Sequence, residues 1–210
     1  MTRPRLLPAL LAAASAAALS GCVIVADTAT VRHEREVAEA PAKSLQQDDI
    51  GYVAPVAPAG PALPAADAVL TSIAFGSCNT AERPIPILDA IVAQADEHDL
   101  FLYVGDNVYG DVDSDDPEMP ELRNAYAMLA ARPEFQRLRS ALPMEFTWDD
   151  HDYGLNDAGG EFPLKAEAQA IFNNFWRVPA GDERRMREGV YTSRMFGPDG
   201  RRVQLIMLDT

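Results

Sequence analysis

Apolar and polar residues follow one another along residues 69–208 in patterns that predict strands and helices in turn. The short apolar run Val69–Phe75 leads into Gly76-Ser77-Cys78-Asn79, which is typical of a strand that enters a loop. In Pro84–His98 the apolar residues recur at spacings of three and four, and the prolines stand in the first turn, which predicts an amphipathic helix. The other expected elements are strands at Leu100–Val104 and Pro143–Trp148, helices at Met119–Ala131, Pro133–Ala141 and Pro163–Trp176, and a hairpin of Val190–Phe196 with Arg202–Leu208.

This order of elements predicts an α/β fold in which helices cover a sheet. In such sheets ligands gather where the carboxyl ends of the strands meet. The segments that begin at Gly76, Gly105 and Trp148 each follow an expected strand, so we expect them to lie at one edge of the sheet.

The first residues have the pattern of an export signal. A basic start with Arg3 and Arg5 precedes the apolar run Leu6–Leu19, which is too short for a membrane-spanning helix of about 20 residues. The sequence Leu19-Ser20-Gly21-Cys22 resembles the lipobox of bacterial lipoproteins, in which the cysteine is acylated and the peptide is cut before it. The resemblance implies lipid on Cys22 and a protein anchored at the periplasmic or extracellular face of the bacterial cell envelope. The alternative is an ordinary export signal with an unrelated cysteine.

The next segment is poor in large apolar residues. Residues 53–64 alternate Pro with Ala, Val and Gly, a composition that favours extended conformers and cannot build a core. The sequence therefore predicts a signal peptide over residues 1–21, a disordered Pro/Ala-rich tether over 22–67 and a folded domain over 68–210.

The chain is strongly acidic, with 32 Asp and Glu against 18 Lys and Arg and a net charge of −14. This balance argues against a nucleic-acid-binding surface, which needs basic side chains to neutralise phosphates. Within the expected domain, two stretches contain acids and no base. Their acids are Asp106, Asp111, Asp113, Asp115, Asp116, Glu118 and Glu121 in the first, and Glu145, Asp149, Asp150, Asp152, Asp157 and Glu161 in the second.

Carboxylates that converge at one sheet edge need a compensating charge. Two like charges 4 Å apart repel by about 4 kcal/mol at an effective dielectric of 20, and multivalent cations with oxygen ligands remove that repulsion. For Asp111–Asp116 alone, a solvated acidic loop is the simpler interpretation. For Asp106 and Asp149–Asp150, which directly follow expected strands, we favour metal binding.

Cys78 adds a sulfur ligand to this set. If Cys22 carries lipid, Cys78 has no disulfide partner, and its thiol is expected to be bound to metal or to be buried as a small apolar side chain. Thiolate, phenolate and carboxylate suit Fe(III), whereas carboxylate and carboxamide oxygens suit Ca²⁺. A metal pair could activate a hydroxide for phosphoester hydrolysis, with His151 donating a proton or stabilising the transition state. The wider candidate set is Cys78, Asp106, Tyr109, Asp149, Asp150, His151 and Asn156.

Three motifs resemble, in order and spacing, the alkaline phosphatase D (PhoD-like) family over about residues 71–210. They are Phe75-Gly76-Ser77-Cys78-Asn79, Gly105-Asp106-Asn107-Val108-Tyr109 and Trp148-Asp149-Asp150-His151-Asp152-Tyr153-Gly154 with Asn156-Asp157, accompanied by Gly189-Val190-Tyr191 and Leu208-Asp209-Thr210. The resemblance implies a metallophosphatase-type four-layer α/β sandwich that hydrolyses phosphate monoesters and diesters with iron and calcium. Other divalent metals remain alternatives.

The resemblance also implies roles for single residues. Cys78, Asp106 and Tyr109 would hold the iron, Asp106 would bridge to calcium, and Asp149 and Asp150 would supply carboxylates on the calcium side. His151 would face the substrate phosphate and, with Asp106, form the catalytic pair. Residues of secondary rank are Asn79, Asn156 and Asp157.

Two departures from the family pattern stand out. Arg3-Pro4-Arg5 is not the paired arginine of twin-arginine export. The family also continues past the position of Thr210 and takes further ligands from later loops, so we expect the domain and its metal site to be incomplete in this chain. Two other functions stay open: a catalytically inactive, Ca²⁺-stabilised surface lipoprotein, and a hydrolase with Cys78 as nucleophile and His151 as base.

Overall fold

The computed structural model describes the backbone of Cys22–Ile24 and the whole of residues 55–209. The expected signal peptide and residues 25–54 of the expected tether lie outside the described residues. Among the residues described, no helix is long and apolar enough to cross a membrane.

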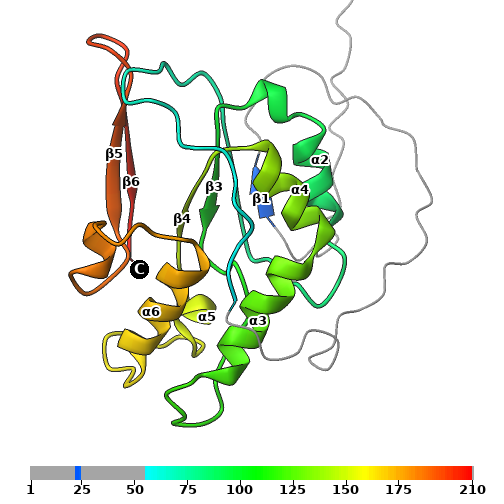
Figure 1. The fold of residues 1–210 in the computed structure, drawn as a ribbon, viewed down its shortest axis with the longest axis vertical. Coiled ribbons are helices and arrows are strands. Elements are labelled where there is room, and N and C mark those ends of the chain that lie inside the picture. Colours follow the sequence, from blue (N-terminus) through cyan, green and yellow to red (C-terminus); the bar gives the residue numbers. More distant parts are fainter. Residues whose placement is uncertain (1–21, 25–54, 210) are drawn as a thin grey trace, which may run out of the picture.

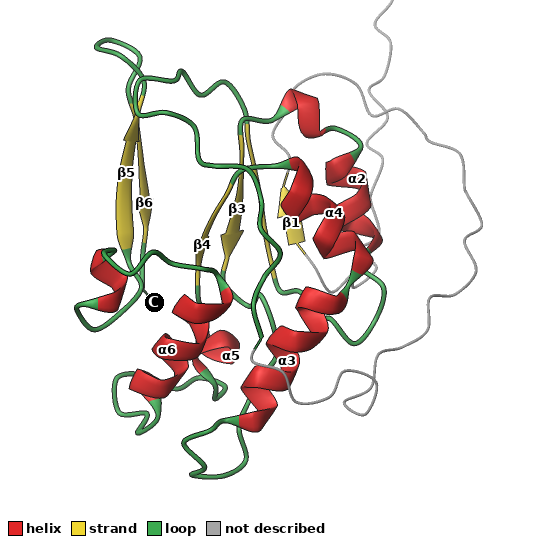
Figure 2. Ribbon diagram, in the orientation of Figure 1, coloured by secondary structure: helices red, strands yellow, loops and turns green. Residues whose placement is uncertain are grey.

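The protein has a mixed α/β architecture around a four-stranded sheet of order β1-β2-β3-β4 (Figures 1 and 2). Strands β2, β3 and β4 are parallel, and β1 pairs antiparallel with β2. The sheet strands are β1 (Cys22–Ile24), β2 (Ile73–Ser77), β3 (Leu100–Val104) and β4 (Met144–Thr147), and a separate hairpin consists of β5 (Thr192–Phe196) and β6 (Val203–Met207). The α/β class and the hairpin predicted from the sequence are thus confirmed.

Helices follow the parallel strands as the apolar spacing predicts. They are α2 (Pro86–Val92), α3 (Pro120–Ala131), α4 (Pro133–Ala141), α5 (Asp150–Tyr153) and α6 (Lys165–Phe175), with short 3-10 turns at Ala95–Glu97 and Glu183–Arg185. The helix expected over Pro84–His98 is shorter than predicted, because Gln94 leaves the helical conformation at φ −117°. The four-residue helix α5 was not predicted.

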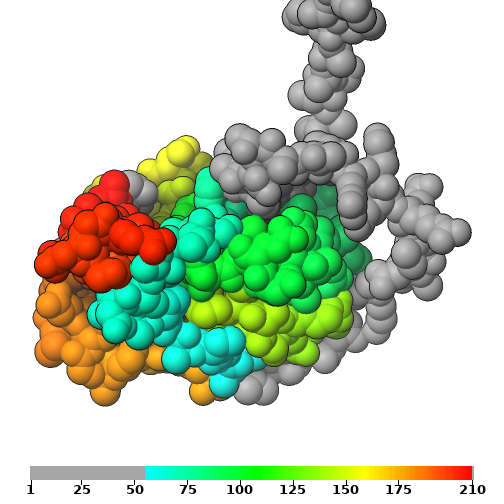
Figure 3. Space-filling view, turned by 90° about the horizontal axis from the view of Figure 1, so that it is seen from above, coloured from blue at the N-terminus to red at the C-terminus, as the bar shows by residue number. Residues whose placement is uncertain are grey.

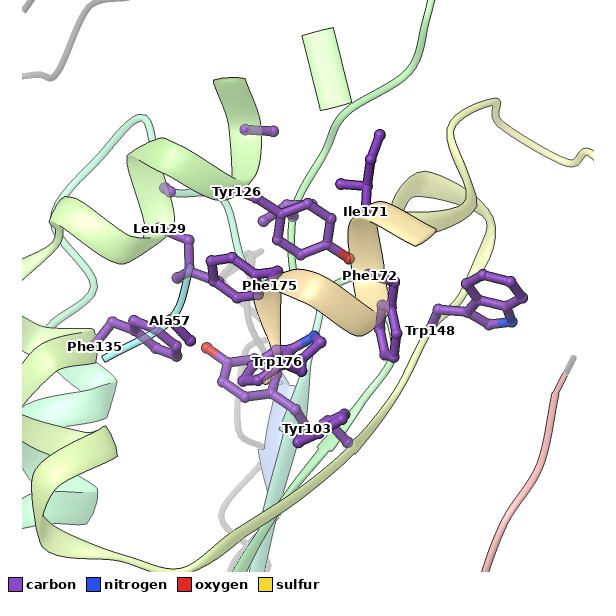
Figure 4. Close-up of a cluster of buried hydrophobic side chains, with 14 of the residues drawn as sticks. Ala57, Tyr103, Tyr126, Leu129, Phe135, Trp148, Ile171, Phe172, Phe175 and Trp176 are labelled. Carbon is purple, nitrogen blue, oxygen red and sulfur yellow. The ribbon is translucent and has the colours of Figure 1, made fainter. Parts of the chain in front are cut away.

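One face of the sheet is covered by helices through an aromatic core (Figure 4). Successive residues of a strand point to opposite faces, so Phe101 and Tyr103 lie on this side. Phe146 stacks on Trp176 of the turn after α6, with ring centroids 4.5 Å apart. Tyr103 contacts the same indole at 5.7 Å. This packing fixes the strands, and therefore fixes where each strand ends.

The other face packs on the hairpin. Leu100 and Leu102 are buried against Met207 of β6, with Leu63, Leu70 and Ile73 among the residues around them. Thr147 at the end of β4 donates through Oγ1 to the carbonyl of Leu208 at 2.6 Å. The C-terminal end of β6 is therefore held next to the carboxyl edge of the sheet.

The last part of the expected tether packs on the domain instead of extending from it. Ala57 is 1% exposed, its N–H donates to the carbonyl of Phe175 at 2.8 Å, and its carbonyl accepts from Arg177 Nε at 2.7 Å. The carbonyl of Ala66 accepts from the N–H of Gly197 in the hairpin turn. Figure 3 shows this segment, in cyan, beside the hairpin, in red. A Pro/Ala-rich chain cannot form a core, but its small side chains and free backbone groups allow it to lie along an existing surface.

Glu145 and three charged neighbours form a buried ion network between β4 and the hairpin. Glu145 is 1% exposed and accepts from Arg184 at 2.9 Å and from Arg194. Arg184 also pairs with Asp182 at 2.9 Å, and the bonds from Arg184 lower the pKa of Asp182 to about 2. Glu145 belongs to the second acid-rich stretch, yet it points away from the carboxyl edge. The second acid-rich stretch therefore contains an acid with a structural role, apart from the candidate metal ligands.

Candidate metal and phosphoester site

The loops that follow β2 and β3 are joined side by side at the carboxyl edge of the sheet. The N–H of Cys78 donates to the carbonyl of Gly105 at 3.4 Å, and the N–H of Asn79 donates to the carbonyl of Asp106 at 2.8 Å. Asn79 also donates through its side chain to the carbonyl of Asn107. These bonds place Cys78 and Asp106 as neighbours although 28 positions of sequence separate them.

Cys78 and Asp106 both have a left-handed backbone, with φ of 56° and 47°. This conformation costs non-glycine residues about 1–3 kcal/mol and persists only where the surrounding structure enforces it. The side chain of Asp106 is turned by this bend into the site, where it is 9% exposed. In the sequence Cys78 follows Ser77 and Asp106 follows Gly105, and neither pair of residues indicates a left-handed backbone.

Tyr109 connects the two side chains. Its hydroxyl donates to Asp106 Oδ2 at 3.2 Å and interacts with the thiol of Cys78. Burial, with the charge of Asp106 and the Cys78 thiol, raises the pKa of Tyr109 far above its ordinary value. Cys78, Asp106 and Tyr109, the expected iron ligands, therefore lie together, and the phenol is protonated when no cation is present.

The end of β4 approaches the same point closely. Gly105 has φ +99°, and a Cβ added there would lie only 2.7 Å from Cβ of Asp149. A glycine is thus needed at this crossing of the two loops. Helix α5 begins directly after it, with Asp149 Oδ1 accepting from the N–H of Asp150. The short helix places Asp150 and His151 over the loop that contains Asp106.

Asp152, which is fully buried, holds this arrangement together. Its carboxylate accepts from the N–H groups of Asn107, Val108 and Asp149 and from the hydroxyl of Tyr126. Burial raises the pKa of Asp152 to about 7, although its hydrogen bonds favour the ionised form. Asp152 therefore binds the two loops to each other and is not available as a ligand.

Asp106, Asp150 and His151 form a group that could hold a metal ion. Each offers one ligand atom, and these atoms lie within 4.8 Å of one another. Burial raises the pKa of Asp106, and the charges of Asp149 and Asp150 add to this effect, while His151 opposes it. Asp106 Oδ1 is buried and has no hydrogen-bond partner in the part of the chain that the structure describes. A buried carboxylate oxygen without a donor fits a cation, since burying it unpaired is costly.

His151 is held from two sides. Its Nδ1 lies 2.8 Å and 3.0 Å from the two carboxylate oxygens of Asp111, and its ring packs on Tyr109 with centroids 4.3 Å apart. Burial by itself lowers the pKa of His151, but Asp111, Asp106 and Asp150 together raise it above its ordinary value. Because Nδ1 is engaged, Nε2 is the nitrogen available to a ligand.

Two of the residues of secondary rank, Asn156 and Asp157, lie around Asp150. The N–H of Asp157, at φ 57°, donates to Asp150 Oδ2 at 2.6 Å, and the side chain of Asn156 donates to Asp157. This bond, with further donors, outweighs burial and lowers the pKa of Asp150. Asn79 is 6% exposed and its amide group is committed to the loop after β3. Cys22 pairs through its backbone with Ser77, and its side chain lies outside what the structure describes.

A cavity of about 310 Å³ begins at Asp150 and extends between α5, α6 and the end of β6. Its lining includes Trp148, Tyr153, Lys165 and Asp209. The carboxylate of Asp209 accepts from the indole N–H of Trp148 and from the N–H of Val190 at 3.0 Å. The three sequence segments around Trp148, Gly189 and Asp209 thus meet at this cavity. They form part of its wall and do not belong to the metal group.

Sequence reasoning missed Asp111 as a site residue. It was assigned to a solvated acidic loop, because four acids follow one another closely over residues 111–116. Its position five residues after Asp106, beyond Gly110, is the only sequence signal that distinguishes it from its neighbours. The contact with His151 depends on how the loop folds back on α5, which periodicity does not reveal.

The fold and the site define a class: a parallel α/β sheet with carboxylates and a histidine gathered at its carboxyl edge. Among solved structures, one described as the structure of PhoD has a similar fold, with a TM-score of 0.50 and 20% sequence identity. The alignment covers 65% of this chain and 31% of that chain, so this chain spans about a third of the length of PhoD. At this identity the similarity establishes the fold alone. No protein-family model and no curated protein matches the sequence.

Proposed function

We propose that this chain belongs to a metal-dependent phosphoester hydrolase of the alkaline phosphatase D type, with a metallophosphatase-type four-layer α/β sandwich. The observation that carries the proposal is that the carboxylates of Asp106 and Asp150 come together around the unpartnered Asp106 Oδ1, with His151 beside them. In this proposal the two carboxylates would bind the metal and His151 would transfer the proton. The similarity to the fold of PhoD supports it. Cys78, Asp106 and Tyr109 would hold Fe(III), and Asp149 and Asp150 would contribute oxygens to Ca²⁺.

A bound metal pair would supply positive charge against the phosphate and lower the pKa of water. The chain itself would provide a proton donor and a binding cavity. As a water oxygen bonds to phosphorus and the ester P–O bond breaks, His151 would give a proton from Nε2 to the leaving oxygen. The cavity that begins at Asp150 would receive the alcohol part of the ester. The proton released by the attacking water would restore the imidazolium.

The test is hydrolysis of p-nitrophenyl phosphate and of bis-p-nitrophenyl phosphate by the purified chain, loaded with Fe(III) and Ca²⁺ and then stripped by chelation. We expect release of p-nitrophenol that chelation abolishes and metal restores. An iron–phenolate bond from Tyr109 would also give the loaded protein a visible colour. Calcium binding without turnover would instead support the non-enzymatic lipoprotein. Turnover that survives chelation but not iodoacetamide would support Cys78 as nucleophile.

We propose in addition that the protein is anchored in the bacterial cell envelope by lipid on Cys22. The support is the sequence Leu19-Ser20-Gly21-Cys22 after a basic, then apolar, start. In a bacterial host fed radiolabelled palmitate, the wild type should incorporate label and fractionate with membranes. Cys22→Ser should do neither, and Cys78→Ser should behave as the wild type; label in Cys22→Ser would contradict the anchor.

A further inference from the structure

We infer that Asp111 is a positioning residue, which holds the His151 ring with Nδ1 protonated and Nε2 free to act at the site. This inference rests on the proposed hydrolase and names how its histidine is oriented. It starts from the two contacts of 2.8 Å and 3.0 Å between His151 Nδ1 and the Asp111 carboxylate. A carboxylate has only acceptor oxygens, so the ring nitrogen that faces it must be the donor.

The backbone around Asp111 is fixed in place, unlike that of a solvated acidic loop. On one side, the N–H of Gly110 donates to the carbonyl of His151 at 3.3 Å, and on the other, the N–H of Val112 donates to the carbonyl of Gly154 at 2.8 Å. Val112 is also buried in the core. Asp111 is thus held directly against α5 by bonds on either side of it, and the Asp–His contact is set by the fold.

The packing at Gly110 reinforces this position. A Cβ added there would lie 2.5 Å from Leu122 Cδ1 and 2.8 Å from Leu122 Cα, so the loop runs directly over α3. The ring of Tyr109 also packs against His151. The imidazole is therefore restricted in rotation by the Tyr109 ring and in tautomer by Asp111.

Two further charges near the ring belong to the metal group. Asp106 and Asp150 act on His151 together with Asp111. With Nδ1 bound to Asp111, only Nε2 can serve the reaction centre at Asp106 and Asp150. Carboxylates that orient metal-ligating histidines in this way are worth about 10- to 100-fold in activity or metal affinity, and we expect an effect of the same order for His151.

The orientation can be measured without metal or substrate. The chain has three histidines, so ring ¹⁵N signals can be assigned by removing His33 and His98 in turn. At a pH above the titration of His151, we expect the metal-free wild type to show Nδ1 protonated. In Asp111→Ala the ring should shift to the Nε2-protonated form or to a mixture. An unchanged tautomer in Asp111→Ala would overturn the inference.

Kinetics of the loaded protein provide the second readout. Asp111→Asn and Asp111→Ala should lower kcat for p-nitrophenyl phosphate by about 10- to 100-fold, with KM changed by less than about twofold. Asp113→Asn is the matched control, since it removes one charge from an exposed position of the same loop and should leave kcat unchanged. Equal kcat in Asp111→Asn and Asp113→Asn would overturn the positioning role.

The two readouts separate this inference from the proposed function. If the wild type hydrolyses no ester but the tautomer changes in Asp111→Ala, the orientation stands and the hydrolase proposal fails. If the wild type is active while Asp111→Ala changes neither kcat nor tautomer, the hydrolase stands and the role of Asp111 fails.

Discussion

Replacing Asp106 with asparagine should abolish metal binding and ester hydrolysis while leaving the metal-free protein as stable as the wild type or more so. Asp106 lies in the metal group and accepts a hydrogen bond from the hydroxyl of Tyr109. Its carboxylate is buried beside Asp149 and Asp150, and these features raise its pKa. Removing the charge relieves this repulsion in the empty protein, yet removes the central anionic ligand. Activity should fall by more than about 100-fold, the upper range for losing a group that only supports a ligand.

The measurement combines metal content, turnover and the melting temperature with and without Ca²⁺ and Fe(III). The wild type should gain stability on adding metal, because a ligand that binds only the folded state stabilises it. Asp106→Asn should gain none, and Asp113→Asn, which removes one charge from an exposed position, should behave as the wild type. His151→Asn should retain metal but lose turnover if His151 is the proton donor. Wild-type metal content in Asp106→Asn would contradict the site.

Arg184→Met should be the most destabilising of the single substitutions considered, at about 3–5 kcal/mol. Arg184 is 2% exposed and bridges Glu145, which is 1% exposed, and Asp182. Without the guanidinium, a buried carboxylate is left with Arg194 as its only remaining ion-pair partner among the residues described. Because the whole free energy of unfolding of a domain is about 5–15 kcal/mol, this substitution would remove a large share of it.

Urea denaturation of the metal-free protein measures this effect, so that loss of the site cannot contribute to it. Arg202→Met is the control: its partner Asp199 is three residues before it on the surface, and the change should be below about 1 kcal/mol. The double substitution Glu145→Leu with Arg184→Met should recover part of the stability, since the cost comes from the unpaired charge. A change below 1 kcal/mol in Arg184→Met alone would rule out a structural role for the network.

The elements that could be predicted from sequence are those whose apolar spacing is set by one buried face. Leu100–Val104 and Pro133–Ala141 begin and end where the pattern places them. Helix α5 was missed because four residues are too few to show a period and its stability comes from Asp149 and Asp152 at its start. The packing of Ala57 was missed because a small residue in a Pro-rich segment contributes no periodic signal.

For the site, the sequence could predict which strand ends meet but not which acids point inward. Five residues were expected together because each follows a parallel strand, and the structure brings them to one edge of the sheet. They are Cys78, Asp106, Tyr109, Asp150 and His151. Glu145 and Asp152 belong to the same acid-rich stretch but were not among the candidate ligands, and their structural roles were not predicted. Glu145 directly precedes Phe146 and therefore faces the opposite side of the sheet. Asp152 is turned into the core by α5. Partner identity, not residue type, decides the role of each carboxylate.

The left-handed backbone of Cys78 and Asp106 affects how this protein would respond to selection in the laboratory. At both positions glycine would adopt the observed φ without strain, so a screen for heat resistance alone would favour replacing two residues of the proposed site. Variants enriched in such a screen would have a higher melting temperature and a lower affinity for a cation. A library designed for both properties should therefore keep positions 78 and 106 constant and seek its gains elsewhere, for instance on the exposed side of the hairpin, where Met195 and Ile206 face solvent.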